Sequence, residues 1–117
     1  MDLNQKLKET LETIGIPVEQ DEYTGKEDKY ILFLYEDEIP QLHGNNRVLS
    51  DTVYLQIQLI TPKNFNYMEW KHRIRDSLEA EGFFVTSIRS FLGDVYAGIE
   101  KTRQTVFQVE YTQGRRN

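Results

Sequence analysis

The sequence predicts an α+β domain, a two-layer fold in which a four-stranded, mainly antiparallel sheet carries two helices on one face. Two observations predict this fold. Two stretches repeat apolar residues at helical spacing, and four stretches have the apolar content or alternation of strands. Their order is α-β-β-α-β-β, with a long loop between the first two strands. A chain of 117 residues has room for one core, so we expect one domain at 1–112 and a frayed tail at 113–117.

The first predicted helix lies at the start of the chain. Asp2 and Gln5 can form a capping box, and Gly15 followed by Pro17 supplies a stop. Between these signals the apolar residues recur at spacings of three and four. The pattern predicts an amphipathic helix with an apolar stripe formed by Leu3, Leu7, Leu11 and Ile14.

A second helix is predicted after Pro62, which ends the preceding strand. Asn66 and Glu69 offer another capping box, and Gly82 closes the helix. The apolar stripe again follows spacings of three and four, and its members are Tyr67, Trp70, Ile74 and Leu78.

The first predicted strand, residues 30–35, follows a polar connection at 18–29 that contains Gly25. Its sequence, YILFLY, is apolar at both side-chain parities, which predicts a strand with both faces shielded from water. The two helices can cover only one face of the sheet. We therefore expect another copy of the chain, or a partner, to cover the other face.

The other three strands are predicted at 52–61, 83–92 and 102–112, and residues 93–101 read as the hairpin connection between the last two. The strand at 52–61 alternates clearly. One face carries Val53, Leu55, Ile57 and Leu59, and the opposite face carries Tyr54, Gln56 and Gln58.

The predicted loop at 36–52 is longer than ordinary connections, which marks it as functional or disordered. It combines acidic residues and turn formers with four aliphatic residues that a solvated loop would not need. We expect the loop to reach a neighbouring molecule and to order on contact. The alternative is that the aliphatic residues fold back on the core of their own chain. They are Ile39, Leu42, Val48 and Leu49.

Composition lowers the expectation for several classes of function. The net charge is −5, from 14 basic and 19 acidic residues, which disfavours binding to a polyanion. The chain has no Cys, so it has no disulfide, thiol nucleophile or thiolate zinc site. It has neither an apolar run long enough to cross a bilayer nor the apolar region of a signal peptide at its start. We expect a soluble protein made in a cytoplasm.

Candidate chemical groups are few. Glu36, Asp37 and Glu38 could bind a hard cation or act in acid–base chemistry, but they lack the alternating ligands and the glycine of a calcium loop. His43 has no second ligand at a metal-binding spacing. We therefore predict no catalytic residue, no cofactor, no metal site and no enzymatic activity.

Three further features follow one another along the chain. A strand broken at Thr61 and Pro62 leads to a helix with an Asn-rich cap, the helix closes with Gly82 and Phe83, and a final hairpin ends in an aromatic-rich strand. With the long connection at 36–52, this succession resembles the small tail completion proteins of long-tailed phages and prophages, also called tail terminator or tail-to-head joining proteins. The resemblance covers element order over residues 1–112. Its other positions are Asn64, Asn66, Phe107, Val109 and Tyr111.

The resemblance implies a structural protein without catalytic residues. Copies in that family assemble as a ring, typically a hexamer, that caps the tail tube and presents a surface to the head connector. The implied partners are the chain itself, a tail tube protein and a head–tail connector protein. The implied location is the host bacterial cytoplasm during assembly and the virion tail afterwards.

Such a ring would use the outer parity of the sheet together with the 36–52 loop. The interface residues we predict are Ile39, Leu42, Val48, Leu49, Tyr54, Gln56 and Ile60. The alternative function is a small nucleic-acid or ligand binding module of split β-α-β type, in which Tyr54 would lie on an exposed sheet face. Salt-sensitive binding to RNA or single-stranded DNA would favour that alternative.

Overall fold

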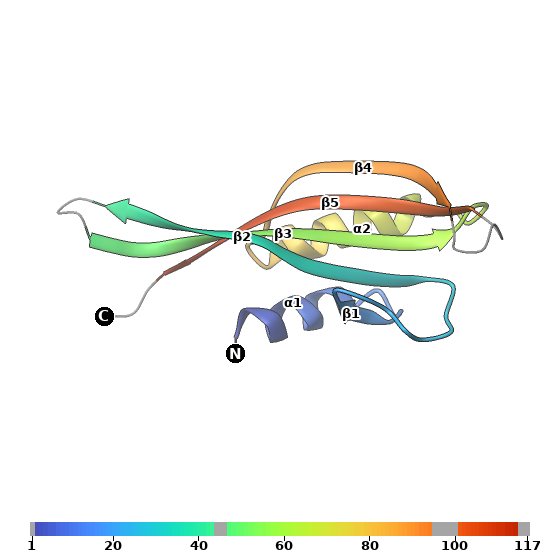
Figure 1. Cartoon of the computed structure of the whole chain (residues 1–117), viewed down its shortest axis with the longest axis horizontal. Helices are drawn as coiled ribbons and strands as arrows, with labels where there is room; N and C mark the ends of the chain where they lie inside the picture. The colour runs from blue at the N-terminus through green and yellow to red at the C-terminus, as the bar shows by residue number, and fades with distance from the viewer. Residues whose placement is uncertain (1, 44–46, 95–100, 115–117) are drawn as a thin grey trace.

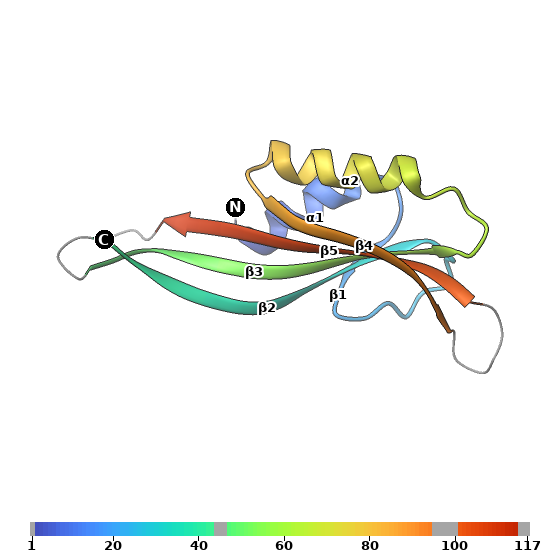
Figure 2. The same cartoon turned by 90° about the horizontal axis from the view of Figure 1, so that it is seen from above.

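The fold is known from a computed structural model that describes residues 2–43, 47–94 and 101–114. Side chains of residues 42–49 and 94 lie outside this description. The α+β prediction is confirmed, with two helices packed on one face of an open, mostly antiparallel sheet. Figure 2 shows both helices on the same side of the sheet.

Seven elements follow one another along the chain, and Figure 1 labels each of them. The sheet order is β1-β2-β3-β5-β4, in which β1 runs parallel to β2 and the other neighbours are antiparallel. The elements are α1 (Leu3–Glu12), β1 (Val18–Gln20), β2 (Tyr30–His43), β3 (Arg47–Pro62), α2 (Met68–Ala80), β4 (Phe84–Asp94) and β5 (Lys101–Gly114).

The start of α1 follows the predicted signal. The backbone N–H of Gln5 donates to Asp2 Oδ1 at 2.8 Å, which satisfies one of the free donors at the start of α1. The capping box predicted for α2 is wrong, because the N-cap residue is Tyr67, without a side-chain cap, and Asn66 Oδ1 accepts from the backbone N–H of Met68 at 3.3 Å. After the two helices the chain turns at Gly15 and Gly82, whose φ angles of 93° and 89° suit glycine.

The core lies between the helices and the facing side of the sheet. Fully buried side chains from α1 and α2 meet the inward residues of three adjacent strands, so both predicted apolar stripes are used. Trp70 is partly buried and packs against this core, as its place on the stripe predicted. The central members are Leu7, Leu11, Ile31, Phe33, Leu55, Ile57, Leu59, Ile74, Leu78, Phe107 and Val109.

The prediction of four strands is wrong, because the sheet has five. β1 lies within the stretch that was predicted to be a connection, and it pairs with Ile31–Phe33 of β2. Only Val18 of its three residues is buried. A strand of three residues is too short to show a periodic pattern, so only its pairing with β2 reveals it.

The predicted long loop at 36–52 is also wrong. β2 continues to His43 and β3 begins at Arg47, so the stretch forms the outer half of a long hairpin. Pairs such as Glu38 with Val53 and Ile39 with Thr52 maintain the ladder. A register shift between Tyr35 and Asp37 interrupts the alternation of β2, and neither helix packs on this part of the sheet (Figure 2). Without a helix to bury one face, the sequence shows no strand pattern there.

The hairpin gives the molecule its elongated shape, with principal extents of 56 × 25 × 24 Å. Residues 37–43, 47–54 and 110–114 form a three-stranded extension, here called the arm, which projects past both helices (Figures 1 and 2). β5 runs to Gly114, two residues past the predicted end of the domain at 112.

Candidate interaction surface

The face of the sheet opposite the helices, here called the outer face, is the first part of the candidate surface. Its residues are the cross-strand partners that alternate with the core residues. Four rows run across β2, β3, β5 and β4 in that order. They are Tyr30, Ile60, Gln104 and Phe91; Leu32, Gln58, Val106 and Arg89; Leu34, Gln56, Gln108 and Ser87; and Asp37, Tyr54, Glu110 and Phe84.

The outer face is partly apolar. Ile60 and Val106, on the two central strands, are each only 6% exposed. Leu32 and Leu34 remain half-buried, whereas Ile31 and Phe33 on the helix side are fully buried. The described part of the chain thus covers one flank of the YILFLY strand and leaves the other partly open to solvent. That another copy covers this flank stays a prediction.

The polar residues of the outer face are mainly amides. Gln58 Nε2 donates to Gln56 Oε1 within β3, and Gln104 and Gln108 extend the amide surface onto β5. Arg89 is the only cation among the sixteen residues of the four rows, and Asp37 and Glu110 oppose its charge. A surface of aliphatic and amide groups suits contact with protein better than contact with phosphates.

A pair of stacked tyrosines lies at the end of the outer face where β2 begins. The rings of Tyr23 and Tyr30 stack with centroids 4.4 Å apart, and Tyr23 Oη accepts from the backbone N–H of Glu27 at 2.9 Å. Burial raises the pKa of Tyr30, and the neighbouring Tyr23 raises it further. This pair holds the segment between β1 and β2 against the start of β2.

The arm is the second part of the candidate surface. Glu36, Asp37, Glu38 and Ile39 are exposed at its base. Among the described residues, no cation forms an ion pair with these three carboxylates. Carboxylates that form no ion pair within the described residues are available to charges on another molecule.

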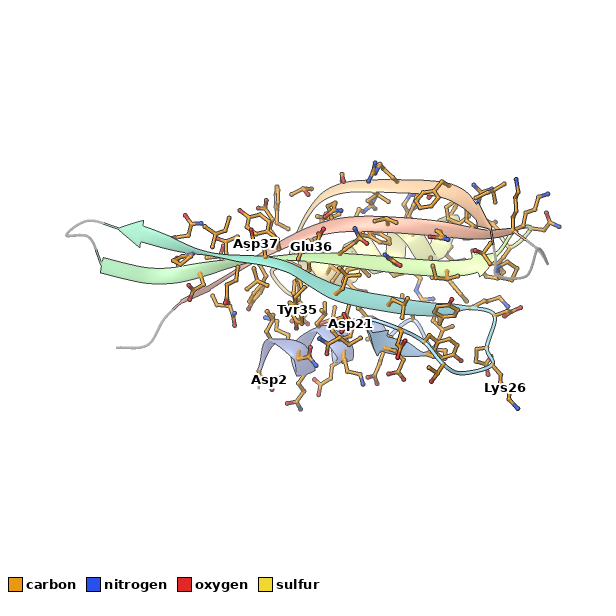
Figure 3. All side chains as sticks on the ribbon, in the orientation of Figure 1. Asp2, Asp21, Lys26, Tyr35, Glu36 and Asp37 are labelled. Carbon is orange, nitrogen blue, oxygen red and sulfur yellow. The ribbon has the colours of Figure 1, made fainter. Side chains whose placement is uncertain are left out.

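A hollow of about 480 Å³ lies where the arm meets the start of α1. Leu3, Tyr35 and Val53 are among its lining residues, together with Asp2 and the three carboxylates of the arm base. Tyr35 points toward α1 (Figure 3), and its hydroxyl donates to Asn4 Oδ1 at 2.9 Å. Burial raises the pKa of Tyr35, and the charge of Asp2 adds to that increase.

The structure spreads the predicted interface residues over both parts of this surface. Ile39 is exposed on the arm, Tyr54 and Gln56 are half-buried on the outer face, and Ile60 is buried there. Leu42, Val48 and Leu49 belong to β2 and β3, but their side chains lie outside the described residues, and so does that of His43.

Sequence reasoning missed the edge strand β4 as part of the surface. Phe84, Phe91 and Leu92 are all exposed there. A signal was present, because residues 83–92 contain one charged residue and place large apolar side chains at both parities. In a central strand that composition would be buried, but β4 is the last strand of the sheet.

No group of three or more His, Asp or Glu side chains in the described ranges is placed to hold a metal ion. No described helix is long and apolar enough to cross a membrane.

Comparisons with known proteins give little more. No protein-family model matches the chain, and no curated protein matches it. One solved structure, of a protein whose name states no activity or partner, is similar over 99% of this chain and 99% of its own. Its sequence identity is 10% and its TM-score is 0.47, so this likeness carries no argument about function.

Proposed function

We propose that this chain is a structural protein that assembles with copies of itself through the outer face and the arm. In the role implied by its resemblance to tail completion proteins, the assembled ring caps a phage tail tube and joins the tail to the head connector. One observation carries the proposal. The outer face and the arm leave aliphatic side chains open to solvent on a sheet that has helices on only one side.

The outer face favours contact with protein on energetic grounds. Leu32 and Leu34 are half-buried in the isolated chain, so covering them would contribute roughly 1 kcal/mol each. Ile60 and Val106 lie between them and the far edge of the sheet and already form a dry centre. Glutamine amides alternate with them on the same two strands, so the face combines apolar contact area with hydrogen-bonding groups, as protein interfaces do.

The arm favours assembly for a different reason. Only its base, at Val53 and Tyr111, packs against the core and α1. Further out neither helix covers its strands, and stable sheets normally need a buried hydrophobic face (Figure 2). Its support within the chain includes the hydroxyl pair of Thr52 and Thr112, with oxygen atoms 3.1 Å apart. Because the arm has so little core of its own, contact with another molecule would add more to its stability than to that of the rest of the sheet.

The second candidate is a nucleic-acid or ligand binding module of split β-α-β type. Tyr54, Phe84 and Phe91 lie on the outer face, where aromatic rings could stack on bases. The charge opposes it, because Arg89 is the only cation in the four described rows and the chain carries a net charge of −5. Salt-sensitive binding to a single-stranded oligonucleotide would favour this candidate over a structural protein.

The test is sedimentation velocity over a rising concentration series, with the chain alone and with polymerised phage tail tubes. The proposal expects a ring-sized species or co-sedimentation with the tubes, and it expects Leu34→Lys to weaken both. Met68→Lys is the matched control, because Met68 is an exposed apolar residue on α2 rather than on the sheet. A wild-type chain that stays monomeric and does not bind tubes would refute the proposal.

A further inference from the structure

The two edges of the sheet are open over most of their length. β4 is the last strand at one edge, and among the described residues only β5 pairs with it. At the other edge, β1 pairs with Ile31–Phe33 alone. The following residues 34–39, here called the β2 edge, have β3 on one side and no described strand on the other. Pro40 ends this stretch, because its nitrogen has no hydrogen to donate.

Exposed apolar side chains concentrate on these two edges. Six large apolar residues are exposed in the described part of the chain, and five of them lie on β4 or the β2 edge. Those on β4 are Phe84, Phe91 and Leu92, at 65%, 46% and 40% exposure; those on the β2 edge are Tyr35 and Ile39, at 37% and 41%. Unpaired backbone groups flanked by apolar side chains are the features that favour addition of a strand.

The charges at the middle of the two edges are opposite. The β2 edge carries Glu36, Asp37 and Glu38, whereas β4 carries Arg89 at its middle and a carboxylate only at its last residue, Asp94. Among the described residues, no ion pair involves Arg89 or the three carboxylates of the β2 edge. Opposite charges facing each other across a strand pair stabilise it, and like charges destabilise it.

The same charges disfavour pairing of either edge with itself. Arg89 is the middle residue of β4 (Phe84–Asp94), so a two-fold antiparallel pair of β4 strands would place Arg89 opposite its own copy. A two-fold pair of β2 edges would place Glu36 opposite Asp37. Both symmetric dimers would bring like charges together, while a pair formed by β4 and the β2 edge would bring opposite charges together.

We propose that β4 of one copy pairs with the β2 edge of a second copy, so that one sheet continues from copy to copy. The inference rests on the proposed self-assembly and identifies the surface that the copies share. β2 and β4 run in opposite directions within the sheet, so copies in the same orientation meet as an antiparallel pair. Such a contact uses two different patches and therefore generates a ring or an open filament.

β1 determines how the copies are offset. Within one copy, Arg89 and Leu32 stand in the same row of cross-strand partners, which also contains Val106 and Gln58. In the second copy Leu32 is not available to a new strand, because β1 already pairs with that part of β2. The second copy must shift along the strands by four to five residues, roughly 15 Å, before β4 meets the β2 edge. A stagger of this kind tilts the strands relative to the axis, as closure of a sheet into a ring requires.

The test reverses charges on each edge, under the conditions in which the wild-type chain assembles. One variant is Arg89→Glu, the second is Glu36→Lys with Glu38→Lys, and the third combines all three substitutions. Asp37 is left in place because its Oδ1 accepts from the backbone N–H of Glu38 at 2.8 Å. The matched control is Glu12→Lys with Glu79→Lys, which reverses two exposed charges on the helices.

We expect each single-edge variant to raise the concentration for half-maximal assembly by about tenfold, equivalent to about 1.4 kcal/mol. The combined variant restores opposite charges, so its half-maximal concentration should return close to that of the control. Circular dichroism checks that every variant folds.

Two results separate the inference from the proposed function. If the wild-type chain assembles and the single-edge variants assemble equally well, the edge pairing is refuted and self-assembly stands. If the single-edge variants do not assemble, and the combined variant folds but does not assemble either, pairing through complementary charges is refuted. A wild-type chain that never assembles refutes both.

Discussion

Two neighbouring residues of β2 provide a direct test of how this chain divides its sheet into a covered and an open face. Ile31 is fully buried against the helices, and Leu32, the next residue, is half-buried on the outer face. Replacing either with Ala removes the same number of carbon atoms. The two substitutions therefore differ mainly in which side of the sheet they affect.

The expected costs follow from the burial of each side chain. Ile31→Ala opens a cavity in a packed core and should lower the free energy of unfolding by about 3 kcal/mol, which lowers the Tm by roughly 12 °C. Leu32→Ala removes a side chain that water already reaches, so its cost should be about 1 kcal/mol. In the assembled protein the order of effects changes, because Leu32→Ala should weaken assembly of a chain that remains folded.

Urea unfolding of the dilute chain measures the loss of unfolding free energy for the two variants, and sedimentation at higher concentration measures their effect on assembly. The result that would refute this reasoning is an equal loss of unfolding free energy for both variants in the dilute chain. It would mean that the chain itself covers Leu32 in solution, and the physical argument for a building block would be lost.

Three further predictions concern the fold. Asp2→Ala should cost about 1 kcal/mol because α1 loses its N-cap acceptor, and Asp2→Asn should recover most of it in thermal unfolding. Gly82→Ala should cost about 1 kcal/mol through its φ of 89°, whereas Gly114→Ala, on a strand with open space around it, should be neutral in the same assay; equal effects would contradict the strain argument. Folding raises the pKa of Tyr30 and of Tyr35, so their protonated forms stabilise the folded state; this contribution to the free energy of unfolding should be constant below pH 10.0 and be lost as pH rises through the folded-state pKa values. Replacing both tyrosines with Phe should reduce that alkaline loss, as measured by unfolding at a series of pH values.

The sequence was informative wherever one face of an element is buried. The stripe ending in Ile74 and Leu78 predicted α2, and the alternation from Val53 to Leu59 predicted the buried half of β3. In both cases the helices and the sheet bury the same periodic set of side chains, so periodicity carries the structural information.

The missed elements are those in which burial does not select the side chains. β1 has three residues and depends on pairing with β2, and beyond its base at Val53 and Tyr111 the arm has no helix against either face. The arm is held together by backbone hydrogen bonds between neighbouring strands. Such bonds form with almost any side chain, so they leave no pattern in the sequence. For the same reason four of the predicted interface residues are wrongly expected on a loop, when they belong to β2 and β3; they are Ile39, Leu42, Val48 and Leu49.

The register shift between Tyr35 and Asp37 decides the chemistry of the arm. With strict alternation, Ile39 would share the side of Ile31 and Phe33. The one inserted residue instead turns Ile39 to the side that carries Leu32 and Leu34, so an exposed aliphatic side chain stands on the outer side of the arm, beyond Asp37. Removing Glu36 from the chain would return Ile39 to the helix side without deleting a single apolar group.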